Sequence, residues 1–177
     1  FVCNESAPHG YNQLHLNPLF DICNRTYFDA IVQPESQKDE IGALVEMLRR
    51  NEFGRKTIIL CDRGYEGYWP LGVMIERPNV DFVLRVKQNH SAMREIARLP
   101  MCELDCSISF SLTTTQTNED KRLRRIHISV PKKSKPGSKT KRSRWDLPSP
   151  YTMRLRIVRF QLDTGVFETL ATSLPPS

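Results

Sequence analysis

The residue best placed for chemistry is Asp62, which directly follows the continuous apolar run from Thr57 to Cys61. A run of this kind, rich in β-branched residues, predicts a strand buried on both faces in a mixed or parallel sheet. Ligands and metal ions bind beyond the carboxyl ends of such strands, where Asp62 would lie. Arg63 and Gly64 follow, and a tight glycine turn can approach a phosphate closely. The alternative is that Asp62 caps the next helix, which is the more common role for an aspartate in this position.

Arg85 and Lys87 are the next candidates, because they alternate along one face of a predicted strand at residues 81–87. If that strand pairs with the strand before Asp62, the two cations lie beside the carboxylate. Two cations on one side of a strand suit contacts with a series of phosphate groups. The alternative is a solvated strand face that binds nothing.

The positive charge of the chain is concentrated in one segment. The net charge is +6, and 11 of the 26 basic residues lie between Lys121 and Arg144, a stretch with no acidic residue. The remaining 15 are outnumbered by the 20 acidic residues. This separation predicts a phosphate-facing patch on an otherwise mildly acidic protein. The predicted DNA contacts are Lys132, Lys133, Lys135, Lys139, Lys141, Arg142 and Arg144, followed by Trp145, which could stack on a base. The alternative is a solvated loop.

Other chemistries have little support in the sequence. The five cysteines are scattered, and the pair Cys102 and Cys106 has no second pair nearby with which to bind zinc. Cys23 and Cys61 lie in apolar runs and are expected to be buried, reduced thiols of a cytoplasmic protein. The four histidines show no ligand spacing, and no nucleotide-binding glycine loop or hydrolase motif occurs. No apolar run approaches the roughly 20 residues that cross a bilayer, so no membrane association is expected.

The secondary structure that must position these residues changes near residue 100, from mixed helices and strands to mostly strands. The first ten residues are expected to be a loop. Beyond them the sequence predicts a hairpin of strands at 11–23 and 27–32, a helix at 38–51, a strand at 57–61, a helix at 66–77, the strand at 81–87 and a short helix at 90–99. The remainder predicts strands at 107–117 and 126–130 and a hairpin of 153–162 with 166–174. We therefore expect an α/β core at 1–100 and a β-rich insertion with the basic segment at 101–177.

Several sequence segments resemble segments of the insertion-sequence 4 family of DDE transposases and occur in the same order. The residues GYNQLHLN at 10–17 and DICNRTYFDA at 21–30 look like the family's second and third strands. ILCDRGYE at 59–66 resembles its second-aspartate motif, FVLRVK at 82–87 the strand that follows, and residues 153–175 the hairpin before its last catalytic helix. The resemblance covers nearly the whole chain, and the order and spacing of the phrases are more specific than any one of them.

The resemblance implies a ribonuclease H-like mixed sheet, incomplete with its first strand missing, that carries an antiparallel β insertion. In the family, two aspartates and one glutamate hold two Mg²⁺ (or Mn²⁺) ions that cleave and join DNA strands. Asp62 would be the second aspartate, a catalytic residue and metal ligand, and Arg63, Arg85 and Lys87 would contact DNA. The partners implied for the complete parent protein are transposon ends and target DNA, with a homodimer as the assembly.

The resemblance also implies that one chain of this extent is not a complete enzyme. The family's first aspartate lies before the GYNQ phrase and its glutamate lies after the Leu-Pro phrase, so both would lie outside these residues. One carboxylate cannot hold two divalent ions, and we expect the isolated chain to be catalytically inactive. Two alternatives stay open, a non-catalytic DNA-binding module and an inactive remnant.

Overall fold

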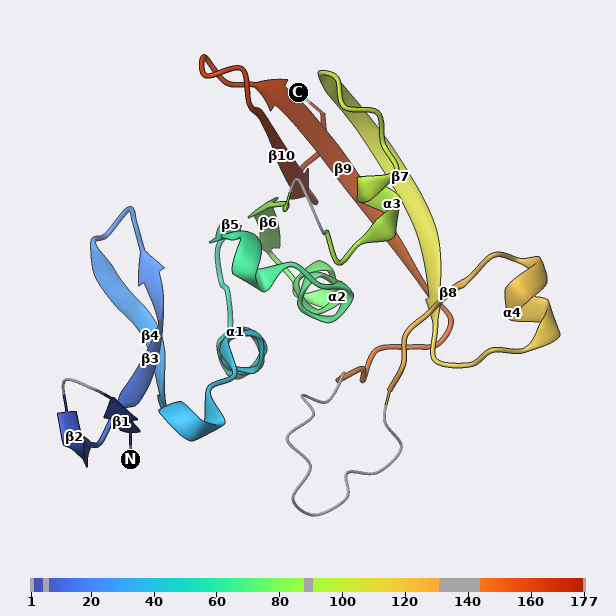
Figure 1. Ribbon diagram of the computed structural model, residues 1–177. Helices are drawn as coiled ribbons and strands as arrows, with labels where there is room; N and C mark the ends of the chain where they lie inside the picture. The colour runs from blue at the N-terminus through green and yellow to red at the C-terminus, as the bar shows by residue number, and fades with distance from the viewer. Residues whose placement is uncertain (1, 5–6, 88–90, 131–143, 177) are drawn as a thin grey trace. The chain divides into compact units, whose positions relative to one another are not determined.

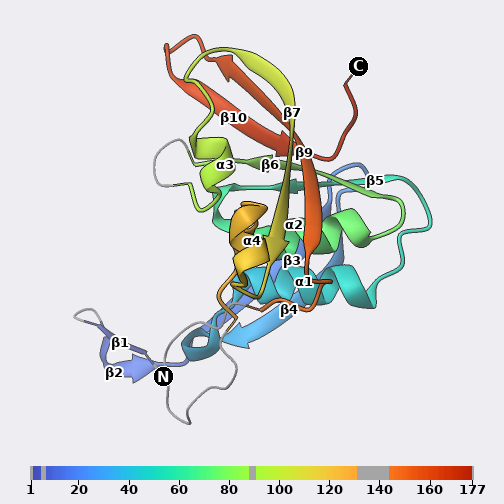
Figure 2. The ribbon, with the colours of Figure 1, turned by 90° about the vertical axis from the view of Figure 1, so that its right-hand side faces the viewer.

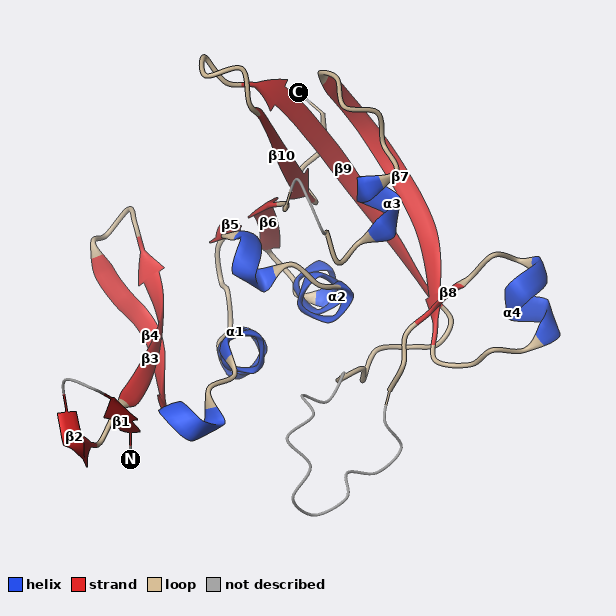
Figure 3. Ribbon diagram, viewed as in Figure 1, coloured by secondary structure: helices blue, strands red, loops and turns tan. Residues whose placement is uncertain are grey.

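The computed structural model describes residues 2–4, 7–87, 91–130 and 144–176. Contacts within the chain divide it into two compact units, Phe1–Gly54 and Arg55–Ser177. Strands make up most of the regular structure, as the red elements in Figure 3 show, and short helices accompany them. The fold is mixed α/β and of the ribonuclease H-like type, as the sequence predicted, with a six-stranded mixed sheet and two separate antiparallel pairs of strands.

The first unit begins with two paired strands and continues into a longer hairpin (Figure 1). β1 (Val2–Asn4) and β2 (Ala7–Tyr11) pair antiparallel, so the prediction that the first ten residues are a loop was wrong. β3 (Leu14–Asp21) and β4 (Thr26–Pro34) form the predicted antiparallel hairpin. Its turn is held by the Asp21 side chain, whose Oδ1 accepts a hydrogen bond from the Asn24 backbone nitrogen at 3.0 Å.

The helix of the first unit, α1 (Glu40–Arg50), forms where the apolar spacing predicted it. Asp39 caps its start, because the side chain accepts a hydrogen bond from the Gly42 nitrogen at 3.0 Å. Leu44, Val45 and Leu48 are buried, and the helix contacts both β3 and β4. A short 3-10 turn, η1 (Glu35–Gln37), connects the hairpin to the helix.

The second unit is built on the six-stranded sheet, shown from two sides in Figures 1 and 2. Its strand order is β5 (Thr57–Cys61), β6 (Val80–Arg85), β10 (Phe167–Thr172), β9 (Tyr151–Gln161), β7 (Leu104–Thr113) and β8 (Ile126–His127). The pairs β5–β6 and β7–β8 are parallel, and the other pairs are antiparallel. The hairpin that the sequence assigned to the insertion is therefore continuous with the sheet that carries Asp62.

One face of this sheet is covered by α2 (Tyr68–Glu76). The helix and the sheet bury Leu71, Met74, Phe82 and Met153, each without measurable exposure. The approach of α2 is close at Gly72, where an added Cβ would collide with the Leu147 side chain. An alanine in the middle of this helix would therefore need the Leu147 side chain to move, which favours glycine here although glycine is a poor helix former.

Three short elements complete the second unit. η2 (Arg63–Tyr65) is a 3-10 turn directly after Asp62. α3 (Arg94–Ala97) is shorter than the predicted helix at 90–99, and α4 (Asn118–Arg122) occupies a stretch whose helix the sequence did not predict. Among the described helices, none is long and apolar enough to cross a membrane.

Candidate functional site

Asp62 lies at the carboxyl end of β5, where the parallel strands β5 and β6 end side by side. Its backbone is extended, and its carbonyl oxygen accepts a hydrogen bond from the Tyr65 nitrogen at 3.0 Å, which closes the η2 turn. The Asp62 side chain makes no capping hydrogen bond to this turn. The alternative prediction, that Asp62 acts as a helix cap, was therefore wrong for the side chain, which is left to interact elsewhere.

Arg85 ends β6 and reaches the Asp62 carboxylate. Its Nη1 is 3.3 Å from Asp62 Oδ1, and its Nη2 is 3.0 Å from Oε2 of Glu168 on β10. The side chains of Asp62 and Arg85 are 69% and 49% exposed, so both remain open to solvent and to a ligand. The structure thus brings together two of the residues singled out in the sequence, and it places a guanidinium between two carboxylates.

Glu168 is a member of this cluster that sequence reasoning did not single out. It accepts hydrogen bonds from Arg63 Nη2 at 3.0 and 2.9 Å, in addition to the bond from Arg85. Burial raises the pKa of Glu168, but the hydrogen bonds from the two arginines outweigh it and the net pKa is lowered. The same contacts raise the pKa of Arg85. No local signal in the sequence indicates this role, because the partners of Glu168 lie on distant segments.

Lys87 is exposed just beyond β6, and its backbone is held by Glu66. Glu66 is 7% exposed, and its Oε2 accepts a hydrogen bond from the Lys87 nitrogen at 2.9 Å. Its Oε1 accepts hydrogen bonds from the Ser91 hydroxyl and, at 3.3 Å, from the Met93 nitrogen. Glu66 therefore joins the end of the Arg85 strand to the segment that leads into α3. The sequence analysis assigned Glu66 no such role.

Most of the basic segment lies outside the described residues. This applies to the predicted DNA contacts Lys132, Lys133, Lys135, Lys139, Lys141 and Arg142. Arg144 is described, and its guanidinium lies 5.8 Å from the centre of the Trp69 ring. Trp145 packs edge-on against Tyr151 at 5.7 Å, and its indole nitrogen donates to the Pro148 oxygen at 3.3 Å. The carboxyl-terminal flank of the segment is therefore anchored on α2 and β9.

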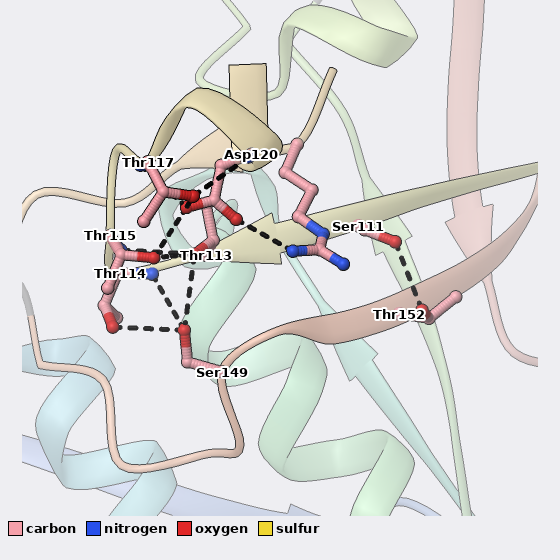
Figure 4. A network of polar contacts seen from close by, with 9 residues as sticks. Ser111, Thr113, Thr114, Thr115, Thr117, Asp120, Ser149 and Thr152 are labelled. Atoms are coloured by element: carbon pink, nitrogen blue, oxygen red, sulfur yellow. Dashed lines mark hydrogen bonds and ion pairs between the residues drawn. The ribbon is translucent and has the colours of Figure 1, made fainter. Parts of the chain in front are cut away.

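A second polar network surrounds Asp120 at the start of α4 (Figure 4). Its Oδ2 accepts hydrogen bonds from the Thr115 and Thr117 hydroxyls at 2.7 and 2.8 Å, and its Oδ1 accepts one from Arg125 at 2.9 Å. These contacts, of which the Arg125 bond is the strongest influence, lower the pKa of Asp120. Thr117 completes a capping box by accepting a bond from the Asp120 nitrogen at 3.1 Å. The carboxylate is saturated by its own neighbours, so this network stabilises the loop.

The cluster at Asp62 does not by itself fit a divalent metal ion. Within the part of the chain that the structure describes, no group of three histidine, cysteine or acidic side chains is close enough together to hold one. The nearest partners of Asp62 and Glu168 are guanidinium groups, whose positive charge opposes a second cation. The described residues instead present two arginines and one exposed carboxylate at the end of a parallel strand pair.

Comparison of the chain with protein-family models, with curated proteins and with solved structures found no match. Function must therefore be inferred from the fold, the motifs and the Asp62 cluster.

Proposed function

We propose that the chain is part of a DDE transposase of the insertion-sequence 4 family and that its ligand is DNA. The observation that carries the proposal is the pairing of Asp62 with Arg85 at the ends of the parallel strands β5 and β6. The carboxyl ends of strands at such a position are where α/β sheets bind ligands. The motif around Asp62 is also the one that resembles the family's second-aspartate motif.

The activity proposed for the complete parent protein is DNA strand cleavage and strand transfer in transposition. There, Asp62 would contribute one ligand to Mg²⁺ or Mn²⁺, and further carboxylates would come from outside these residues. The parent protein would act as a homodimer in the cytoplasm, on transposon ends and target DNA. The chain by itself would bind DNA without cutting it, because its one exposed carboxylate at the site is paired with an arginine.

The DNA contacts of this chain are proposed to be of two kinds. Arg85 is half exposed and Lys87 is exposed, so both can reach a phosphate at the end of the sheet. Arg63 and Arg85 also both bind Glu168. The basic segment from Lys132 to Arg144 would add backbone contacts that do not depend on sequence. A non-catalytic DNA-binding module is the second candidate, and it is favoured by the arginine groups that pair with Asp62 and Glu168.

The proposal is tested by measuring binding of the chain to a fluorescent 30-base-pair duplex as a function of NaCl concentration. We expect the logarithm of the binding constant to fall linearly with the logarithm of the salt concentration. Arg85→Gln should reduce the slope by about 1, because one phosphate contact is lost. Arg156→Gln is the matched control, since Arg156 is likewise paired with a carboxylate, that of Asp105, on the same sheet.

A second assay asks whether the chain nicks supercoiled DNA in the presence of Mg²⁺ or Mn²⁺. We expect no nicking above background with the chain alone. Salt-sensitive binding that Arg85→Gln weakens and Arg156→Gln does not would support the proposal. Absence of DNA binding at low salt would contradict it, and metal-dependent nicking that Asp62→Asn abolishes would contradict the statement that the chain alone is inactive.

A further inference from the structure

A short basic turn lies at the end of α4, just beyond the end of β7 (Figure 1). Lys121 and Arg122 belong to the last turn of the helix, Arg124 follows two positions later, and all three residues are exposed. We call these three residues the α4 cations. Among the side chains that the structure describes, no carboxylate pairs with any of them. Because an unpaired charge is costly to bury, they require either water or an anionic partner.

The neighbouring Arg125 differs from the α4 cations, because it is paired within the turn. Its Nη1 is 2.9 Å from Asp120 Oδ1, and its side chain is 22% exposed. Residues 118–125 contain four basic and two acidic residues, which gives a net charge of +2 (4 − 2). With Arg125 and Asp120 neutralising each other, the three α4 cations are balanced in this stretch by Glu119 alone. The positive charge of the turn is therefore presented outward.

The backbone of the turn is fixed by its own contacts before any ligand binds. Asp120 is held by its capping network (Figure 4), and its carbonyl oxygen accepts a hydrogen bond from the Arg125 nitrogen at 2.9 Å. The Arg124 nitrogen donates to the Lys121 oxygen at 3.1 Å, and Arg124 has a φ of 51°. Helices often end with a residue in this left-handed conformation, and that residue is usually glycine. An arginine here is strained where glycine would not be, which favours a role for its side chain.

We propose that the α4 cations bind phosphate groups of a DNA backbone. The inference rests on the proposed DNA function but assigns a different surface, since the contacts expected in the basic segment begin at Lys132. It is also separate from the Asp62 cluster. The strand register places Arg85 level with Asp105 of β7, through Leu170 and Val158. The α4 turn comes after Thr113, eight residues further along β7 than Asp105.

The separation along the strands gives the length of DNA that would reach both places. Eight residues at about 3.4 Å each correspond to about 27 Å, or roughly eight base pairs of duplex. Contacts with phosphates fix the position and orientation of a protein on the duplex and carry no sequence information. The role proposed for the α4 cations is therefore to position the DNA, and a fixed turn suits that role.

The test is the salt dependence of DNA binding by the whole chain carrying Arg124→Gly. The substitution removes one cation and relieves the positive φ, so the fold should be retained while the salt slope falls by about 1. At about 0.1 M salt, this loss corresponds to roughly tenfold weaker binding. Arg25→Gly is the matched control, because Arg25 is also exposed, has a φ of 55° and removes the same charge. The control should change the slope by less than about 0.3.

The double variant Lys121→Gln and Arg122→Gln extends the test to the rest of the turn. It should reduce the salt slope by about 2, because two phosphate contacts are lost. The reduction should be the same for duplexes of unrelated sequence, since phosphate contacts do not read bases. A reduction found with one sequence alone would contradict a contact with the backbone.

Thermal unfolding followed by circular dichroism establishes that each variant folds. If Arg124→Gly does not fold, Arg124→Asn serves instead, because asparagine also tolerates the left-handed conformation. Equal salt slopes for the folded Arg124 and Arg25 variants would overturn the proposal. The proposed DNA function would still stand in that case if Arg85→Gln weakened binding, whereas a wild-type chain that binds no DNA would overturn both.

Discussion

The guanidinium of Arg63 contacts both carboxylate oxygens of Glu168, at 3.0 and 2.9 Å, across 105 positions of the chain. The contact ties the turn that follows Asp62 to β10, a strand far from it in the sequence. Arg85 joins the same carboxylate from β6. Hydrogen bonds from two arginines to one buried carboxylate therefore hold together the end of the sheet where the DNA site is proposed.

The first prediction is that Glu168→Gln destabilises the chain by about 1–3 kcal/mol at pH 7, because hydrogen bonds between charged groups are lost. Because the folded pKa of Glu168 is lowered, its ionised form contributes stability above the ordinary glutamate pKa of about 4.3. That contribution is lost as the pH falls through the folded pKa. The difference between wild type and variant in urea unfolding should thus be full above about pH 5 and shrink below it.

The control for Glu168→Gln is Glu103→Gln. Glu103 is exposed and accepts one long bond, 3.4 Å from the Gln161 nitrogen. Its substitution should change stability by less than about 0.5 kcal/mol. A pH-independent difference for the Glu168 variant would show that ionisation of this carboxyl group does not contribute to stability.

The second prediction concerns the cap of α4. Thr117→Ala should destabilise the second unit by about 1 kcal/mol, because the Asp120 nitrogen loses its acceptor and the Asp120 carboxylate loses a donor. Thr117→Ser keeps the hydroxyl and should restore most of the stability. Thermal unfolding followed by circular dichroism measures both. Equal melting temperatures for the alanine and serine variants would mean that the hydroxyl does not act as a cap.

The third prediction is that Gly72→Ala destabilises the chain although alanine is the better helix former. The gain in helix propensity is about 1 kcal/mol, and the collision with the Leu147 side chain costs about 1–3 kcal/mol. Gly54→Ala is the matched control, because an added Cβ at Gly54 has no atom within 4 Å. Urea unfolding compares the two variants, and a stabilised Gly72→Ala protein would show that the segment at Leu147 does not pack on α2.

The fourth prediction concerns thiol reactivity. Burial raises the pKa of Cys61 to about 12, whereas Cys23 and Cys102 are exposed. The thiolate is the reactive form, so at pH 8 Cys61 should react with iodoacetamide at least 100-fold more slowly than the exposed pair. Peptide mass spectrometry over a time course gives the rate at each site. Comparable rates at Cys61 and Cys23 in the folded chain would contradict the buried position of the Cys61 side chain.

The sequence was sufficient where structure follows from local periodicity. The β3–β4 hairpin, α1, β5 and β6 all formed near their predicted positions, because each is specified by a short apolar pattern and its flanking turns. Burial of Cys61 was confirmed. The prediction that its strand is buried on both faces was wrong, because Ile58 and Leu60 on the other face of β5 are 48% and 62% exposed. The expected burial of Cys23 was wrong, because it lies in the hairpin turn, where a neighbouring apolar residue does not imply a core.

The remaining features depend on long-range pairing or on exceptions to local rules. Pro8 and Gly10 indicate a break, yet β2 includes both, because a two-stranded edge tolerates residues that a central strand does not. The turn residues at 163–165 predict that 166–174 pairs with 153–162, but they do not say that the same strand also pairs with Val80–Arg85. The role of Glu168 could not be predicted for the same reason, since both arginines that bind it are brought close only by the completed sheet.

The interior position of β10 has a consequence for folding during synthesis. β10 lies between β6 and β9, although it follows both of them in the sequence. Arg85 pairs with Leu170, so one edge of β6 has no partner strand when β6 leaves the ribosome. At ordinary rates of translation, β10 is synthesised on the order of ten seconds later. Until then the β5–β6 pair offers its backbone to any other strand nearby, and this interval is when the nascent protein is most exposed to aggregation.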